Sequence, residues 1–143
     1  MTMVLPSLVP SLGASDEGWQ KRVDVWRDPR VVIGGSDAGA HLDLMCHANY
    51  TTRVLAEAVR RRSLMSLEEA VHRLTDVPAR LYGLTGRGRV AEGWHADLVV
   101  FDPRTVDSAP ARAREDLPGG GMRLYAEGIG IRHVLVNGVE IVT

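Results

Sequence analysis

The sequence predicts an α/β fold, and three observations carry this prediction. An amphipathic pattern over residues 15–28 precedes a short apolar run, Val31–Ile33, and further amphipathic segments fill residues 50–83. From residue 84 onward, glycine-punctuated and β-branched stretches replace them. A helix followed by a strand that is apolar throughout is typical of parallel α/β architectures. We therefore expect three parts: an irregular lead-in over residues 1–14, an α/β part over 15–83 and a β-rich part over 84–143.

The composition indicates a folded chain without an electrostatic preference for nucleic acid or membranes. The chain has 143 residues, 45% of them hydrophobic and 24% charged, and its formal net charge is −1. These values fit one globular domain or a piece of a larger one. No apolar stretch approaches the roughly 20 residues of a membrane helix. Because Cys46 is the single cysteine, no intrachain disulfide can form, and we expect a cytoplasmic protein.

The first helix is predicted by its cap and by its apolar spacing. Ser15 is placed to cap the amino end, and Trp19, Val23 and Trp26 recur at i, i+4 and i+7. The pair Asp28-Pro29 ends the helix, since the residue before a proline disfavours helical geometry. The strand Val31–Ile33 follows directly.

The next helices carry equally local signals. Residues 50–62 present an apolar face of Val54, Leu55, Ala58 and Val59. Ser66 and Glu69 have the spacing of a capping box, in which each side chain accepts from the other residue's main-chain N–H. A short helix with Pro78 in its first turn is expected to stop at Gly83.

The β-rich part is predicted to hold one strand, one long loop and a terminal hairpin. Residues 97–102 form the strand, and residues 103–121 are rich in proline, glycine and charge, which indicates a polar loop. Asn137-Gly138 stands between two β-branched runs, and this pair favours a tight type I′ turn. Arg87 and Arg89, in the glycine-rich turn before the strand, are expected to be solvated.

The stretch that follows Val31–Ile33 is the main candidate for chemistry. In "VVIGGSDAGAH", two glycines lead from the strand to Ser36, Asp37 and His41. Polar residues just past the carboxyl end of a parallel strand are where sites gather in such folds. Asp37 is suited to ligate a metal ion or to take a proton from metal-bound water. The alternative is a structural role for Asp37 in an Asx-turn or a helix cap.

Two other interpretations of this stretch remain open. Ser36 resembles the nucleophile of a serine hydrolase, but residue 38 is alanine where that motif requires glycine. His41 and His47 are either ligands or solvated loop residues, and Cys46 is expected to be a small buried residue. A zinc site needs three or four protein ligands, and the sequence contains no His-x-His pair to begin one.

Longer motifs resemble one enzyme family. "SLEEAVHRLTDVPARLYGLTGRGRVAEGWHADLVVFD" and "VLVNGVEIV" resemble the carboxyl-terminal part of the metal-dependent amidohydrolases. "GGSDAGAHLD" resembles the loop after the eighth barrel strand in the branch that includes D-aminoacylases and N-acyl-D-amino-acid deacylases. The resemblance covers roughly residues 20–143. It implies the last strand and helices of a (β/α)₈ barrel together with the carboxyl-terminal strands of an accompanying β-sandwich.

The resemblance also implies a function. Family members hydrolyse linear amide C–N bonds with zinc, and Asp37 matches the aspartate that contacts the metal and shuttles a proton from water to the leaving amine. His41 and Ser36 are implied to face a small N-acyl amino acid substrate. The other ligands have no counterpart in this sequence, so we expect the chain to be inactive alone. We expect it to pair with a second copy or with a separate chain that carries the missing barrel. The alternative is a non-catalytic remnant that serves as a folding or assembly module.

Overall fold

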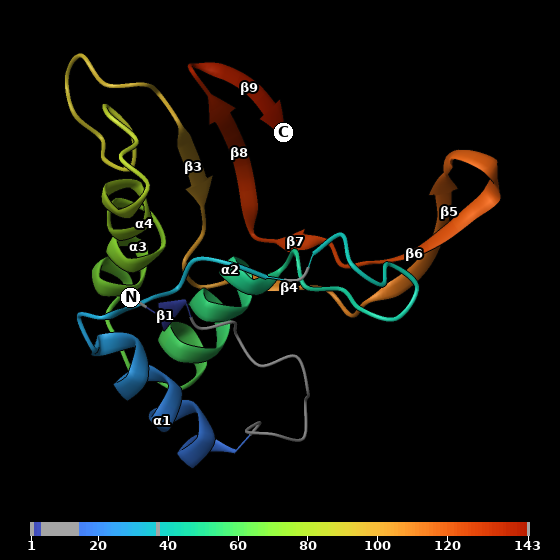
Figure 1. Cartoon of the computed structure of the whole chain (residues 1–143), viewed down its shortest axis with the longest axis horizontal. Helices are drawn as coiled ribbons and strands as arrows, with labels where there is room; N and C mark the ends of the chain where they lie inside the picture. The colour runs from blue at the N-terminus through green and yellow to red at the C-terminus, as the bar shows by residue number, and fades with distance from the viewer. Residues whose placement is uncertain (1, 4–14, 37, 143) are drawn as a thin grey trace.

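The computed structural model describes residues 2–3, 15–36 and 38–142 (Figure 1). The helices are α1 (Asp16–Arg27), α2 (Tyr50–Val54) with its π-helical continuation η1 (Leu55–Arg61), α3 (Leu67–Leu74), α4 (Asp76–Leu81) and the 3₁₀ turn η2 (Pro118–Gly120). The strands are β1 (Thr2–Met3), β2 (Val31–Val32), β3 (Leu98–Phe101), β4 (Asp107–Ser108), β5 (Arg112–Leu117), β6 (Gly121–Tyr125), β7 (Gly128–Ile129), β8 (Ile131–Val136) and β9 (Val139–Val142). In the described ranges, no helix is long and apolar enough to cross a membrane.

Helix α1 confirms the helix predicted over residues 15–28, and β2 confirms that a strand follows it. The Ser15 hydroxyl accepts a hydrogen bond from the Gly18 N–H at 3.2 Å. The predicted apolar stripe of α1 is buried. Strand β2 pairs in parallel with β1, and Ile33, which follows β2, is 2% exposed. The predicted parallel strand is therefore present over Val31–Val32, one residue shorter than expected, with Val32 and Ile33 buried and Val31 half-buried.

The predicted helix over residues 50–62 is confirmed, with a change of pitch along its length. After Val54 the helix widens into η1, and the chain leaves it with the N–H groups of Leu64 and Met65 both directed to the Ala58 carbonyl, at 2.8 and 3.4 Å. Val54, Leu55 and Ala58 are buried as predicted, and Val59 is half-buried.

The capping box of α3 is half correct. The Ser66 hydroxyl accepts from the Glu69 N–H at 3.0 Å. The Glu69 carboxylate, however, accepts from the Arg27 guanidinium at 2.9 and 2.8 Å and from Arg73 at 3.1 Å. A bidentate guanidinium is a stronger partner than one amide N–H. Glu69 therefore links α3 to α1.

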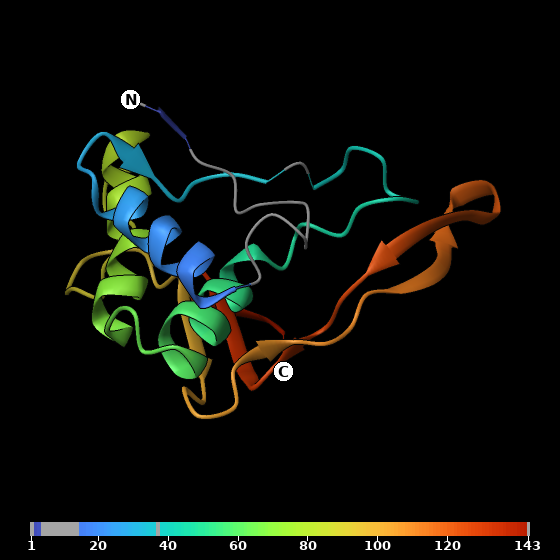
Figure 2. The ribbon, with the colours of Figure 1, turned by 90° about the horizontal axis from the view of Figure 1, so that it is seen from below.

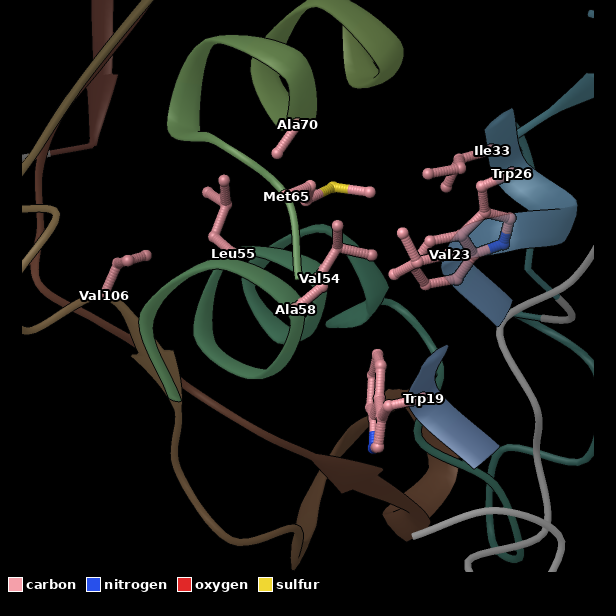
Figure 3. Close-up of a cluster of buried hydrophobic side chains, with 10 residues drawn as sticks. All are labelled: Trp19, Val23, Trp26, Ile33, Val54, Leu55, Ala58, Met65, Ala70 and Val106. Atoms are coloured by element: carbon pink, nitrogen blue, oxygen red, sulfur yellow. The ribbon is translucent and has the colours of Figure 1, made fainter. Parts of the chain in front are cut away.

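The helices and β2 enclose one apolar cluster (Figure 3). Trp19 and Trp26 of α1 meet edge to face, with ring centroids 6.1 Å apart. Val54 and Ala58 face α1 from the α2–η1 helix. Val106, from the segment before β4, reaches the same cluster. This cluster fixes the end of β2, and with it the start of the loop that the sequence singled out.

The terminal strands form an antiparallel sheet in the order β3-β8-β9. Val136 lies opposite Val139, and the two residues between them, Asn137 and Gly138, have φ values of 51° and 79°. Both central residues are thus left-handed, which confirms the predicted type I′ turn. The Asn137 N–H also donates to the Asp97 carboxylate at 2.9 Å, tying the turn to the start of β3.

The prediction of a polar loop over residues 103–121 is wrong. Residues 107–129 form a long antiparallel ribbon, in which β4 pairs with β7 and β5 pairs with β6. Figures 1 and 2 show the β5–β6 hairpin extending away from the helices. Gly119 and Gly120, with φ of 75° and 74°, close the hairpin. The glycines that indicated a loop therefore make its turn, and charged side chains occupy its strands.

Candidate functional site

The candidate site lies in the segment between β2 and α2, which we call the β2–α2 loop (residues 33–49). Asp37, the residue predicted to contact a metal, lies outside the described residues. Ser36 is described, and its hydroxyl accepts a hydrogen bond from the Ala38 N–H at 3.2 Å. This is a local turn contact, and it gives no support to the nucleophile interpretation.

His41 occupies a constrained backbone position in the same loop. Its φ is 47°, which is uncommon for a residue other than glycine. Its carbonyl accepts from the N–H groups of Leu44 and Met45, both at 2.9 Å. The residue itself is exposed. The loop is therefore folded on itself around His41, and its ring remains accessible.

Cys46 and His47 lie further along the loop and are both half-buried. The expectation of a buried Cys46 is therefore wrong. The His47 Nδ1 atom is buried and has no hydrogen-bond partner in the described ranges. A buried polar atom without a partner costs free energy, so this nitrogen requires a partner that the described residues do not provide.

The β5–β6 hairpin borders this loop. The Leu124 N–H of β6 donates to the Leu42 carbonyl at 2.7 Å, and both ribbon views place the hairpin beside the loop (Figures 1 and 2). Arg123 donates to the Asp116 carboxylate across the hairpin at 2.6 and 2.7 Å. This ion pair holds the pKa of Asp116 below its ordinary value and that of Arg123 above it. Sequence reasoning missed these residues because it assigned the start of the hairpin to a loop.

The base of the ribbon is fixed to the helix that follows the loop. The hydroxyls of Ser108 in β4 and Thr52 in α2 are 2.8 Å apart. Arg60 of η1 donates to the Val106 carbonyl at 3.2 Å and to the Asp107 carboxylate at 2.7 Å. The ribbon thus contacts both the β2–α2 loop and the helix that ends it.

The part of the chain that the structure describes does not supply a metal site by itself. In residues 2–3, 15–36 and 38–142, no group of three His, Cys, Asp or Glu side chains is arranged to hold an ion. A zinc ion needs three or four protein ligands. Zinc therefore does not fit the described donor set, and no reaction step can be derived from it.

A second concave region lies between α4 and the glycine-rich turn. It has a volume of about 350 Å³ and is bordered by Arg80, Arg89 and Trp94. Asp76, which is 5% exposed, accepts from Arg89 at 2.5 and 3.0 Å and forms an ion pair with Arg80 at 3.0 Å. Arg89 is exposed, as expected, although its guanidinium is held by Asp76, whereas Arg87 is half-buried and pairs with Asp97. Asp76 is surrounded by cations, so its role is to hold the turn against α4.

Curated relatives resemble the chain over part of its length. It is 47% identical over 90 residues to an N-acyl-D-glutamate deacylase of Alcaligenes xylosoxydans xylosoxydans, which covers 63% of this chain and 17% of the relative. It is 40% identical over 95 residues to an N-acyl-D-aspartate deacylase of the same organism, covering 63% and 16%. The chain thus matches about a sixth of the length of these relatives.

A solved structure extends the match. The N-acyl-D-glutamate deacylase of Bordetella bronchiseptica, complexed with zinc and a phosphonate inhibitor, aligns with a TM-score of 0.56 and 36% identity over 88% of this chain and 24% of that one. The model of the amidohydrolase family matches residues 22–142. These matches confirm the resemblance seen in the sequence motifs, and the chain belongs to the amidohydrolase family.

Proposed function

We propose that this chain is the carboxyl-terminal portion of a metal-dependent hydrolase of linear amide C–N bonds, an N-acyl-D-amino-acid deacylase. The observation that carries the proposal is the 36% identity, over 88% of the chain, to a deacylase structure that holds zinc. In this proposal β2 is the last strand of a (β/α)₈ barrel, and β3, β8 and β9 belong to the accompanying β-sandwich. The parallel pairing of β2 with β1 and its buried position support that assignment.

Asp37 is the carboxylate that the chain would contribute to such a site. It follows the carboxyl end of β2 by a few residues, which is where active sites of parallel barrels lie. A zinc ion held there would supply activated water. His41, exposed in the same loop, would face the substrate, with Ser36 beside it. Because the described donors do not form a metal site, we propose that the other ligands come from a second polypeptide or a second copy of this chain.

A hybrid enzyme tests this proposal. The matching quarter of the Bordetella bronchiseptica deacylase would be replaced by residues 15–143 of this chain, and hydrolysis of N-acetyl-D-glutamate would be measured together with zinc content. We expect turnover in the hybrid and none from the isolated chain. Asp37→Asn should abolish turnover, whereas Asp43→Asn, which changes an exposed carboxylate of the same loop, should leave it within a few-fold. Equal activity of the two variants would contradict the role of Asp37.

A second candidate is a non-catalytic assembly module. The observation that favours it is the exposed apolar surface of the β3-β8-β9 sheet, where Val99, Val139 and Ile141 are 54%, 65% and 59% exposed. Surfaces of this kind mark interaction sites when they are contiguous. Light scattering and metal analysis of the isolated chain distinguish the two. If the chain associates, but neither the isolated chain nor its complex with a barrel partner contains zinc, the result favours the assembly module.

A further inference from the structure

We infer that the β5–β6 hairpin is a positioning element for residues 38–49 of the β2–α2 loop, and that the main-chain N–H of Leu124 is the group through which it acts. The placement of the loop is independent of any reaction. Its consequence for catalysis rests on the proposed function, since His41 in this loop is proposed to face the substrate.

The Leu124 N–H points outward from the β5–β6 hairpin. Leu124 lies opposite Ala113 in the β5–β6 pair, and its N–H donates to the Leu42 carbonyl at 2.7 Å. In an antiparallel pair, alternate residues turn their main-chain groups outward. Leu124 is one of these, so its N–H is available at the outer edge of β6. The Leu42 carbonyl of the β2–α2 loop accepts this N–H.

Side-chain contacts on both sides of Leu124 stabilise the hairpin. Arg123, beside Leu124, is held by Asp116 through two hydrogen bonds. The Tyr125 ring, on the other side of Leu124, carries the guanidinium of Arg114 at 4.0 Å and that of Arg123 at 5.0 Å from its centroid. Such cation–π contacts add to the ladder of a two-stranded hairpin, which is marginal alone. The residues flanking Leu124 therefore keep its N–H in a fixed position.

The segment that the hairpin holds is the part of the β2–α2 loop around Leu42. Leu42 follows His41, whose left-handed backbone makes the loop turn at that point. The described loop residues belong to no helix or strand, so their position depends on contacts such as this one. The hairpin thus holds the loop at Leu42, the residue that follows this turn.

The base of the ribbon is attached to the helix that follows the loop. Ser108 and Thr52 join the base of the ribbon to α2, the helix into which the loop runs. Asp107 pairs with Arg60 further along this helix. The ribbon is therefore attached both to the middle of the loop, at Leu42, and to the helix that follows the loop.

Hydrogen exchange measured by mass spectrometry on the full chain tests the inference without substrate or metal. Leu124→Pro removes the N–H at an edge position that tolerates proline, whereas Leu124→Ala shortens the side chain and keeps the N–H. We expect amides of residues 38–49 to exchange about three to ten times faster in the proline variant, the loss of one hydrogen bond. Amides of α1 and α3 should keep the wild-type rate, and the alanine variant should match the wild type throughout. Unchanged exchange of the loop in Leu124→Pro overturns the inference.

A second variant guards against a proline that disturbs the whole ribbon. Tyr125→Ala removes the ring between the two guanidiniums and should also accelerate exchange of residues 38–49. Arg112→Gln, a change of an exposed residue opposite Tyr125 in the same hairpin, should not. If Tyr125→Ala leaves the loop at the wild-type rate, the hairpin does not position it.

The hybrid deacylase separates this inference from the proposed function. In the hybrid enzyme, Leu124→Pro should raise KM about three- to tenfold with a smaller change in kcat. Leu124→Ala, which keeps the N–H, should have the KM of the unsubstituted hybrid. Proline and alanine variants with equal KM would overturn the catalytic consequence. An inactive hybrid together with faster loop exchange would reject the proposed function and keep the positioning role.

Discussion

The helical region and the strand region of this molecule are stabilised in different ways. In the described ranges, every buried hydrophobic residue except Val106 lies between Trp19 and Ala79. The sheet β3-β8-β9 instead exposes several large apolar side chains, among them Val99, Val139 and Ile141, and the β5–β6 hairpin exposes Met122. The helical region therefore has its own core, whereas the strand region depends on main-chain ladders, glycine turns and ion pairs. Substitutions in the two regions should differ accordingly.

Replacing a core tryptophan gives the largest expected effect. Trp26 is 1% exposed and belongs to the buried cluster (Figure 3). Trp26→Ala should lower the free energy of unfolding by about 3–5 kcal/mol, because it removes a large buried ring and leaves a cavity. Urea unfolding followed by circular dichroism measures it.

The matched change in the strand region is Ile141→Ala, at a side chain that is 59% exposed. It should cost less than about 1 kcal/mol, because little buried surface is lost. Similar losses for the two variants would show that the sheet has a buried core of its own.

The junction between the regions depends on Gly130. Its φ is 74°, and a Cβ at this position would lie 2.7 Å from the Thr105 hydroxyl and 2.8 Å from the Val106 nitrogen. Gly130→Ala should destabilise the chain by about 2–4 kcal/mol through backbone strain and steric overlap. Gly93, with φ of 78° and no atom within 4 Å of its Cβ position, is the control. Gly93→Ala should cost only the conformational penalty of about 1–2 kcal/mol, measured in the same way.

The same contrast explains what the sequence predicted. Helix α1, the α2–η1 helix and the Asn137-Gly138 turn were predicted correctly, because each is set by signals within a few residues. The β5–β6 hairpin was missed because its stability comes from pairs across the ribbon, such as Arg123 with Asp116. Those pairs depend on register, which a charged stretch with glycines does not reveal.

The candidate site was predictable only in part. Its place after a buried strand followed from the apolar run and the two glycines. The bond from Leu124 to Leu42 joins segments more than eighty residues apart, and main-chain groups carry no sequence signal for such a partner. The burial of His47 Nδ1, which has no hydrogen-bond partner among the described residues, was equally unpredictable, since burial of a loop histidine is a property of the fold.

The ion pair between α1 and α3 should make the stability of the helical region depend on pH. Hydrogen bonds from Arg27 lower the pKa of Glu69 to about 2, from an ordinary value of 4.5. A carboxyl group with a lowered pKa in the folded state stabilises it above pH 4.5, and this contribution disappears as the pH falls toward 2. We expect the wild type to lose about 1–2 kcal/mol more than Glu69→Gln between pH 5 and pH 2.5, after allowance for partial solvent screening. Urea unfolding at both pH values tests it, and parallel losses would contradict it.

The smallest effect on stability should come from the exposed face of the sheet. Val139 is 65% exposed and lies opposite Val136 beside the terminal turn. Val139→Lys should change the free energy of unfolding by less than about 0.5 kcal/mol, since the side chain contacts solvent before and after the change. If this face binds a second copy of the chain, the lysine should nevertheless weaken association, because a charge buried between two apolar faces has no partner. Light scattering over a concentration series, with the exposed Val90→Lys as control, would show a lower mass for Val139→Lys alone. An unchanged mass would mean that the copies associate through another surface, so that the exposed valines would have to be explained by a different partner.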